Sequence, residues 1–265
     1  MRRLLERFVD SQRGLCQRIA RFLPADYRID GFSDFAKLLT PYLTWGARVY
    51  DVGGGKRPFI DPSTKATLGL NVVGLDIDEN ELVSAPGGAY DEIICVDITR
   101  YPGRADADVV ICKTLLEHVS STEAALAAIV SILRPEGRAV LFVPSRNAIH
   151  ARLNLILPEP VRKAILQILY PQSHTYVGFP AYYDRCTPTD FRRLAAMHGL
   201  IVEEQKVYFS GAYCACFVPL YLVWCLWIVA YRWLAKDQAA ELFAMVLRKP
   251  GYVITGEHGY AVELQ

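Results

Sequence analysis

Short runs of Val, Ile and Leu recur along the middle of the chain, and segments with a helical spacing of apolar residues lie between them. Such a run predicts a buried strand, and a helix between two runs predicts a crossover in a parallel sheet. The clearest helix is STEAALAAIVSILRPEG, with Ser and Thr at its start and a Pro-Glu-Gly stop. The pattern predicts a doubly wound α/β domain over about residues 45–146, with strands at 48–55, 71–77, 91–98, 107–112 and 138–144.

Two flanking regions follow other patterns. TPTDFRRLAAMHG at 187–199 predicts a helix that starts at Pro188 and ends at Gly199, and the runs at 200–211 and 241–250 predict two more strands. Between these strands the chain has no charged residue from Val207 to Tyr231. At the N-terminus, apolar residues recur at roughly helical spacing among six arginines. This basic amphipathic helix could lie on an anionic membrane surface or pack on its own domain.

Composition narrows the class of protein. The 265 residues are 52% hydrophobic with a net charge of +1, which excludes intrinsic disorder and argues against a nucleic-acid binder with a strongly basic surface. The seven cysteines lack regular spacing, so neither a disulfide framework nor a metal site is predicted and a reducing compartment is expected. We expect no signal peptide, because the N-terminus lacks a continuous apolar run.

Glycines and acidic residues lie where the predicted strands end. Gly53, Gly54 and Gly55 follow the first strand and allow a sharp turn close to a ligand. Asp51 lies in the first strand's end, and Asp76 and Asp97 close the next two strands. Because carboxyl ends of parallel strands meet at one edge, these carboxylates are predicted to share a site.

These motifs, VYDVGGG, GLDID, CVDIT and ADVVICKTLLEHV followed by LRPEG, resemble the class I S-adenosylmethionine-dependent methyltransferases, especially the small-molecule branch. The resemblance implies a Rossmann-like fold: a doubly wound, seven-stranded, mostly parallel sheet with apolar helical insertions after strand 5 and between strands 6 and 7. One departure is that Arg57 and Pro58 follow Gly55, which predicts a shortened helix there. A nicotinamide dehydrogenase is the competing interpretation, and Pro58 stands where that pattern needs its last glycine.

The resemblance also implies which residues bind S-adenosyl-L-methionine. Glycines of the turn would border the methionine part, and Asp51 would orient the loop or reach the amino group through water. Asp76 would hold the ribose diol, and the remaining positions would contact adenine or the methionine side. The implied set is Asp51, Gly53, Gly55, Asp76, Ile77, Asp97, Ile98 and Lys113.

Methyl transfer to a hydroxyl needs a base that removes its proton. His118 is the first candidate, because it follows the fourth strand and imidazole titrates near neutral pH. A structural histidine that caps the following helix is the alternative. His174 and Asp184, together with two tyrosines, form a second candidate cluster that would line a substrate pocket or simply pack over the sheet. The identity of the base stays open.

The apolar surplus concentrates in two insertions at 147–186 and 212–237, within a domain expected at 46–265 behind an N-terminal helical segment at 1–45. A single membrane crossing would separate the last strand from its sheet, so 212–235 is expected to lie in the interface, dip in and return, or fold back. Arg232 and Lys236 could meet phosphate headgroups there.

We therefore expect an enzyme that methylates, at oxygen, a lipophilic or lipid-linked acceptor such as a lipid-linked saccharide. It would act in the cytoplasm as a peripheral or monotopic protein at the membrane, with its oligomeric state open. Two alternatives remain: a soluble small-molecule methyltransferase whose apolar segment is a lid or dimer interface, and a non-catalytic relative that serves as a membrane partner.

Overall fold

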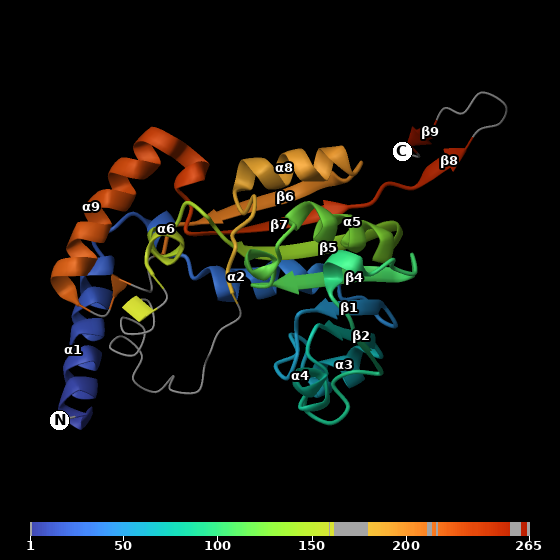
Figure 1. The fold of residues 1–265 in the computed structure, drawn as a ribbon, viewed down its shortest axis with the longest axis horizontal. Coiled ribbons are helices and arrows are strands. Elements are labelled where there is room, and N and C mark those ends of the chain that lie inside the picture. Colours follow the sequence, from blue (N-terminus) through green and yellow to red (C-terminus); the bar gives the residue numbers. More distant parts are fainter. Residues whose placement is uncertain are drawn as a thin grey trace.

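A seven-stranded sheet forms the centre of the computed structural model, which describes residues 2–158, 160–161, 180–210, 214–215, 217–254 and 261–263. The strand order is β3-β2-β1-β4-β5-β7-β6, and only β7 runs antiparallel to its neighbours (Figure 1). This confirms the predicted fold class. The strands are β1 Arg48–Val52, β2 Asn71–Asp76, β3 Glu92–Cys95, β4 Ala107–Lys113, β5 Leu133–Pro144, β6 Ile201–Tyr208 and β7 Leu242–Arg248.

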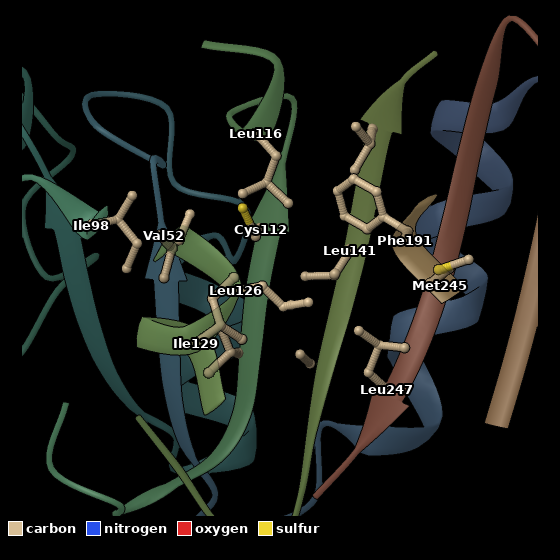
Figure 2. Packing of buried hydrophobic residues seen from close by; sticks show 14 of the residues in the cluster. Val52, Ile98, Cys112, Leu116, Leu126, Ile129, Leu141, Phe191, Met245 and Leu247 are labelled. Carbon is tan, nitrogen blue, oxygen red and sulfur yellow. The ribbon is translucent and has the colours of Figure 1, made fainter. Parts of the chain in front are cut away.

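Helices cover both faces of this sheet. On one face, α5 (Thr122–Ile132) and α8 (Pro188–Met197) pack through Leu126, Ile129 and Phe191 against buried side chains of the strands (Figure 2). On the other, α2 (Gly31–Leu39) buries Phe35 and Leu39. Both strand faces are therefore apolar, as their continuous Val- and Ile-rich sequences require. The short helices α3 (Pro62–Leu68) and α4 (Glu79–Val83) complete the crossovers.

Local signals account for several element boundaries. Ser121 caps α5 and Thr187 caps α8, each by accepting a backbone N–H in the first turn. After the glycine turn no helix begins until Pro62, capped by Asp61, in agreement with the shortened helix predicted there. One boundary differs. The Pro-Glu-Gly segment, which was predicted to end the helix, is part of β5. This strand begins at Leu133, and its pairing with β4 has an irregular register there.

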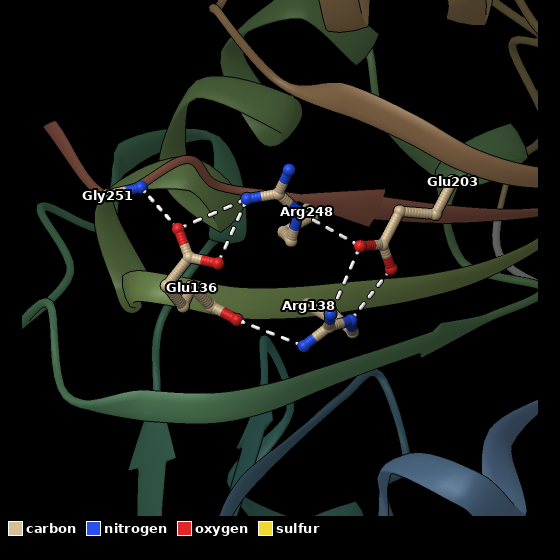
Figure 3. Close-up of polar contacts among 5 residues, drawn as sticks. All are labelled: Glu136, Arg138, Glu203, Arg248 and Gly251. Atoms are coloured by element: carbon tan, nitrogen blue, oxygen red, sulfur yellow. Dashed lines mark hydrogen bonds and ion pairs between the residues drawn. The ribbon is translucent and has the colours of Figure 1, made fainter. Parts of the chain in front are cut away.

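An ionic network joins β5, β6 and β7 at the end of the sheet where β5 begins. Glu203 accepts hydrogen bonds from Arg138 at 2.7 and 3.0 Å and forms an ion pair with Arg248 at 2.9 Å (Figure 3). Arg248 also reaches Glu136, which in turn accepts from the Gly251 amide. Because one glutamate serves two arginines, the network fixes the register of the antiparallel strands at the end away from the glycine turn.

Two long helices form a second small core at the other end. α1 (Arg2–Ala20) packs on α9 (Val218–Ala235), burying Cys16, Trp224 and Ile228 together with Phe209 (Figure 1). The insertion that contains α9 starts and ends on paired strands, since the Glu241 amide donates to the Tyr208 carbonyl at 2.9 Å. A single membrane crossing by α9 is therefore excluded. The other described elements include α6 (Ile149–Ile156), the 3-10 helices η1 (Ala25–Tyr27), η2 (Thr40–Tyr42) and η6 (Lys236–Ala239), and the antiparallel strands β8 (Tyr252–Ile254) and β9 (Ala261–Glu263).

Arg232, in the last turn of α9, contacts the segment that follows α1. Its guanidinium pairs with Asp26 at 2.9 Å and stacks over the rings of Tyr27 and Phe209. These groups are its partners in the structure, and a contact of Arg232 with lipid phosphate stays a prediction. Arg232 holds the segment after α1 against α9.

Candidate functional site

The glycine turn after β1 leaves no room for side chains. Gly53 and Gly55 have φ values of +79° and +48°, a region that glycine adopts readily. A Cβ on Gly53 would lie 2.9 Å from Leu115, and one on Gly54 would lie 2.5 Å from an Asp51 carboxylate oxygen. Backbone rather than side chain therefore faces the open edge of the sheet at this turn.

Asp51 holds the segment that follows the turn. Its side chain is 2% exposed, and Oδ2 accepts a hydrogen bond from the Phe59 amide at 2.7 Å. Burial raises the pKa of Asp51 to about 6, opposed by that hydrogen bond and by the charge of Lys113. A buried carboxylate bound to a loop amide orients the loop, so residues 53–59 are fixed as a unit.

Asp76 occupies the end of β2, across the turn from Asp51. Its Oδ1 accepts from the Asp78 amide at 3.1 Å, while Oδ2 faces Gly55, on which a Cβ would lie 3.2 Å away. The side chain is half-buried, and burial raises its pKa. A bound donor such as a vicinal diol would compensate the cost of that burial, because a desolvated carboxylate is stabilised by hydrogen bonds.

The neighbouring strand end places the remaining residues that the resemblance assigns to the adenine side. The Val96 amide donates to the Asp76 carbonyl at 2.9 Å, which brings the loop with Asp97 beside Asp76. Asp97 accepts from the Thr99 amide and hydroxyl and thereby starts η3 (Ile98–Arg100). Ile98 is buried in the core and Ile77 is 59% exposed. Of the two isoleucines, Ile77 presents the open apolar surface at this edge.

Lys113 ends β4 beside the glycine turn. Its ammonium lies 5.2 Å from the ring centroids of both Phe32 and Phe59. The next residue, Thr114, has a φ of +50°, so the chain turns sharply as it leaves the strand. Burial lowers the pKa of Lys113, and Asp51 acts in the opposite direction. The charges of Lys113 and Asp51 therefore influence each other's pKa.

The motif after β4 contains a buried carboxyl group. Glu117, in η4 (Leu116–His118), is 4% exposed, and burial raises its pKa to about 8. His118 follows it, with Nδ1 3.0 Å from the Pro180 carbonyl and Nε2 3.7 Å from Glu117 Oε1. Because a carbonyl only accepts, Nδ1 carries the proton of a neutral ring and Nε2 is left as its basic atom. His118 does not cap α5, since Ser121 does.

The other two candidate catalytic residues do not join His118 in a described cluster. Asp184 Oδ2 accepts from the Thr122 amide at 2.9 Å, and its carbonyl accepts from the Thr122 hydroxyl, so Asp184 fixes the start of α5. His174 lies outside the described residues. The segment around Asp184 nevertheless reaches the site, because the amides of Tyr182 and Tyr183 donate to the Glu117 carbonyl. A catalytic role for each of the three residues stays a prediction.

Sequence reasoning missed two residues of the site. Tyr90 donates to the Gly55 carbonyl at 2.9 Å and lays its ring where a Cβ on Gly74 would fall. No spacing rule marks a lone tyrosine ahead of a short strand. Glu117 lies inside the motif that carried the resemblance. The sequence signal for it is a single acidic residue within an apolar run, which is buried in the structure.

Comparison with known proteins assigns the family. A methyltransferase domain family matches residues 7–205. Two ubiquinone biosynthesis O-methyltransferases, from Cupriavidus pinatubonensis and Thiobacillus denitrificans, are 31% and 30% identical over 170 and 168 residues, which is 61% and 60% of this chain. These matches cover 63% and 66% of the relatives, so the similarity spans less than two thirds of their length.

Solved structures support the fold. Phosphoethanolamine N-methyltransferase 2 of Haemonchus contortus, in complex with S-adenosyl-L-methionine, has a TM-score of 0.52 at 16% identity, covering 83% of this chain and 53% of that one. A methyltransferase of Methanosarcina mazei has a TM-score of 0.50 at 14% identity, with coverage of 80% and 96%. The chain belongs to the methyltransferase domain family and has the fold of the class I S-adenosylmethionine-dependent methyltransferases.

Proposed function

We propose that this protein is an S-adenosylmethionine-dependent methyltransferase that methylates a hydroxyl oxygen of a lipophilic acceptor at a membrane surface. The observation that carries the cofactor assignment is the edge where β1 and β2 end, with a glycine turn too tight for side chains and the Asp76 carboxylate facing it. The names of the curated relatives, ubiquinone biosynthesis O-methyltransferases, favour oxygen as the methylated atom and a lipophilic, quinone-type acceptor.

In this function the residues divide into binding and proton-handling groups. Asp76 would accept hydrogen bonds from the ribose diol, and Ile77 would pack on the adenine, next to Asp97. The turn at Gly53 and Gly55 would border the methionine part. The remaining positions of this proposed binding set are Asp51, Ile98 and Lys113.

The cofactor supplies a methyl group on a positively charged sulfonium, so the chain's task is to align a nucleophile and remove its proton. His118 Nε2 is the proposed acceptor of that proton, since Nδ1 is held by the Pro180 carbonyl. Glu117 Oε1 lies 3.7 Å from Nε2, and because burial raises the pKa of Glu117 to about 8, we expect this carboxyl group to be neutral at pH 7. His174 and Asp184 are kept as proposed contributors on the acceptor side.

The outer face of α9 supports a membrane location. One face of this helix buries Tyr221, Trp224, Cys225 and Ile228. Its opposite side exposes large apolar residues at helical spacing, and 22% of the helix window Val218–Ala239 is buried. That helix is long and apolar enough to cross a membrane, although its chain ends return to one sheet edge. We define the α9 stripe as Val223 (63% exposed), Leu226 (75%), Trp233 (82%) and Leu234 (72%).

The insertion that carries the α9 stripe leaves the sheet at the same edge as the glycine turn. The registers Pro144↔Leu242 and Tyr208↔Leu242 place the ends of β5 and β6 together, where α6 and α9 leave the sheet. α6 adds the exposed Ile156, and the turn after α1 adds Phe22. An acceptor with a long apolar tail could remain in the lipid layer while its polar end reaches this edge.

Calorimetric titration with S-adenosylmethionine tests the cofactor assignment. We expect the wild type to bind and Asp76→Ala to lose at least about tenfold in affinity, since a hydrogen bond to a charged group contributes about 1.5–3 kcal/mol. Asp78→Ala is the matched control for a carboxylate on the same loop. A wild type that does not bind, or an Asp76→Ala variant that binds equally well, would rule out this site.

Sedimentation with vesicles of phosphatidylethanolamine and phosphatidylglycerol tests the membrane surface. Replacing Val223, Leu226 and Leu234 by Gln should leave the fold intact and lower vesicle binding at least about a hundredfold, because burying such side chains contributes about 1.5–3 kcal/mol each. The control replaces three exposed apolar residues elsewhere, Val83, Ile93 and Met197. A wild type that stays in the supernatant as a dimer favours the soluble alternative instead.

A further inference from the structure

Lys113 is a half-buried lysine at the edge that the proposed function assigns to the cofactor. Its ammonium is flanked by the rings of Phe32 and Phe59, each centroid 5.2 Å away. Phe32 belongs to α2 and Phe59 to the loop that Asp51 anchors. Two separate segments thus shape the surroundings of one cation.

Two lysines that follow the glycine turn along the chain have carboxylate partners. Lys56 pairs with Glu81 at 2.7 Å, and Lys65 pairs with Asp91 at the same distance. For Lys113, no carboxylate of the described residues lies within ion-pair distance; Asp51 acts on it only through a longer-range attraction, and Asp51 itself is bound to the Phe59 amide. A cation withdrawn from water without a direct anionic partner is costly, and a ligand anion would relieve that cost.

The position of Lys113 indicates which anion fits. Cys112 pairs in register with Val52, the residue before Gly53, so Lys113 lies across from the start of the glycine turn. Resting on the proposed function, we infer that the Lys113 ammonium binds the carboxylate of the cofactor's methionine moiety and thereby selects cofactors that carry it. Phe32 and Phe59 then keep the ammonium in place and exclude water from the pair.

Decarboxylated S-adenosylmethionine provides a direct probe, because it keeps the adenosine, the sulfonium and the amino group and lacks only the carboxylate. Calorimetric dissociation constants are measured for both compounds on wild type, Lys113→Met and Lys113→Arg. The wild type should prefer S-adenosylmethionine by about ten- to one-hundredfold, the usual range for a charged hydrogen bond. Lys113→Met should reduce that preference to about twofold or less, and Lys113→Arg should restore part of it.

Lys56→Met is the matched control, since it removes a lysine charge from the same turn and should keep the wild-type preference. Folding of each variant is checked by its thermal unfolding midpoint. A preference that is equal in wild type and Lys113→Met would overturn the inference and assign Lys113 to holding Asp51 alone. A wild type that binds neither compound would instead refute the proposed function. Equal binding of both compounds by the wild type would leave the cofactor site standing and refute the role of Lys113.

Discussion

Glu117 should make the protein less stable as the pH rises. The carboxyl group is buried, and burial raises its pKa from 4.5 to about 8. A group whose pKa is higher in the folded state holds its proton more tightly there. The free energy of unfolding contributed by Glu117 is therefore complete below pH 4.5 and is lost as the pH rises through about 8.

The size of this change in stability follows from the difference between the two pKa values. One pKa unit corresponds to about 1.4 kcal/mol, so ionising Glu117 in place costs at most about 5 kcal/mol. Glu117→Gln removes the ionisable group while keeping its shape. Its amide places a new donor in the buried site, which costs about 1–3 kcal/mol at every pH. The sign of the pH dependence is thus more informative than the stability at any one pH.

Urea unfolding of wild type and Glu117→Gln across pH 4.5 to 9 tests this. We expect the variant to be the less stable protein at the acidic end and to gain on the wild type by about 2–5 kcal/mol at the alkaline end. Glu79→Gln, an exposed glutamate at the start of α4, controls for the loss of one negative charge. A difference between wild type and Glu117→Gln that is constant with pH would refute the reasoning.

Three further substitutions test the surroundings of the site. Gly54→Ala would place a methyl group 2.5 Å from the Asp51 carboxylate, so we expect a loss of about 1–3 kcal/mol in urea unfolding and a weaker thermal shift with S-adenosylmethionine. Asp184→Ala removes the acceptor at the start of α5 and should cost about 0.5–2 kcal/mol; an unchanged stability with a lost methylation rate would favour the catalytic role instead. Trp224→Phe leaves the buried Glu241 carboxylate without its indole donor, and an unfolding free energy lowered by less than about 0.5 kcal/mol would contradict that contact.

Most of the sheet was predictable because its strands are marked locally. A continuous run of Val and Ile indicates a strand that is buried on both faces of a sheet. Ser121 and Thr187 mark the starts of their helices, because each accepts a hydrogen bond within the first turn. The turn at Gly53 was equally predictable, since only glycine readily adopts a positive φ and leaves room for a neighbouring side chain to approach the backbone. Such features depend on neighbours within a few positions along the chain.

The unpredicted features depend on contacts between distant segments. Arg232 reaches Asp26 across 206 positions, so nothing near it in the sequence distinguishes this arginine from one that faces lipid. Tyr90 reaches back 35 positions to the Gly55 carbonyl. β5 begins at Leu133, which pairs with Ala107 of β4 ahead of an irregular register, so the strand includes the Pro-Glu-Gly segment that was predicted to end the helix.

Polar contacts join α6 and α9, the described helices of the two apolar insertions, which bears on how an acceptor would approach. A buried carboxylate at Glu241 accepts from Trp224 of α9 and lies 3.2 Å from His150 of α6, while Arg152 of α6 donates to Tyr231 of α9 at 2.7 Å. Polar contacts with such geometry fix one helix against the other, whereas an apolar seam alone would permit sliding. The hydrophobic residues of α9 thus have two different environments, one on each face of the helix. One face of α9 forms a core with α1, and the α9 stripe stays exposed. On the proposed function, the membrane would thus bind a rigid platform, and the distance from lipid to the sheet edge would be set by the fold.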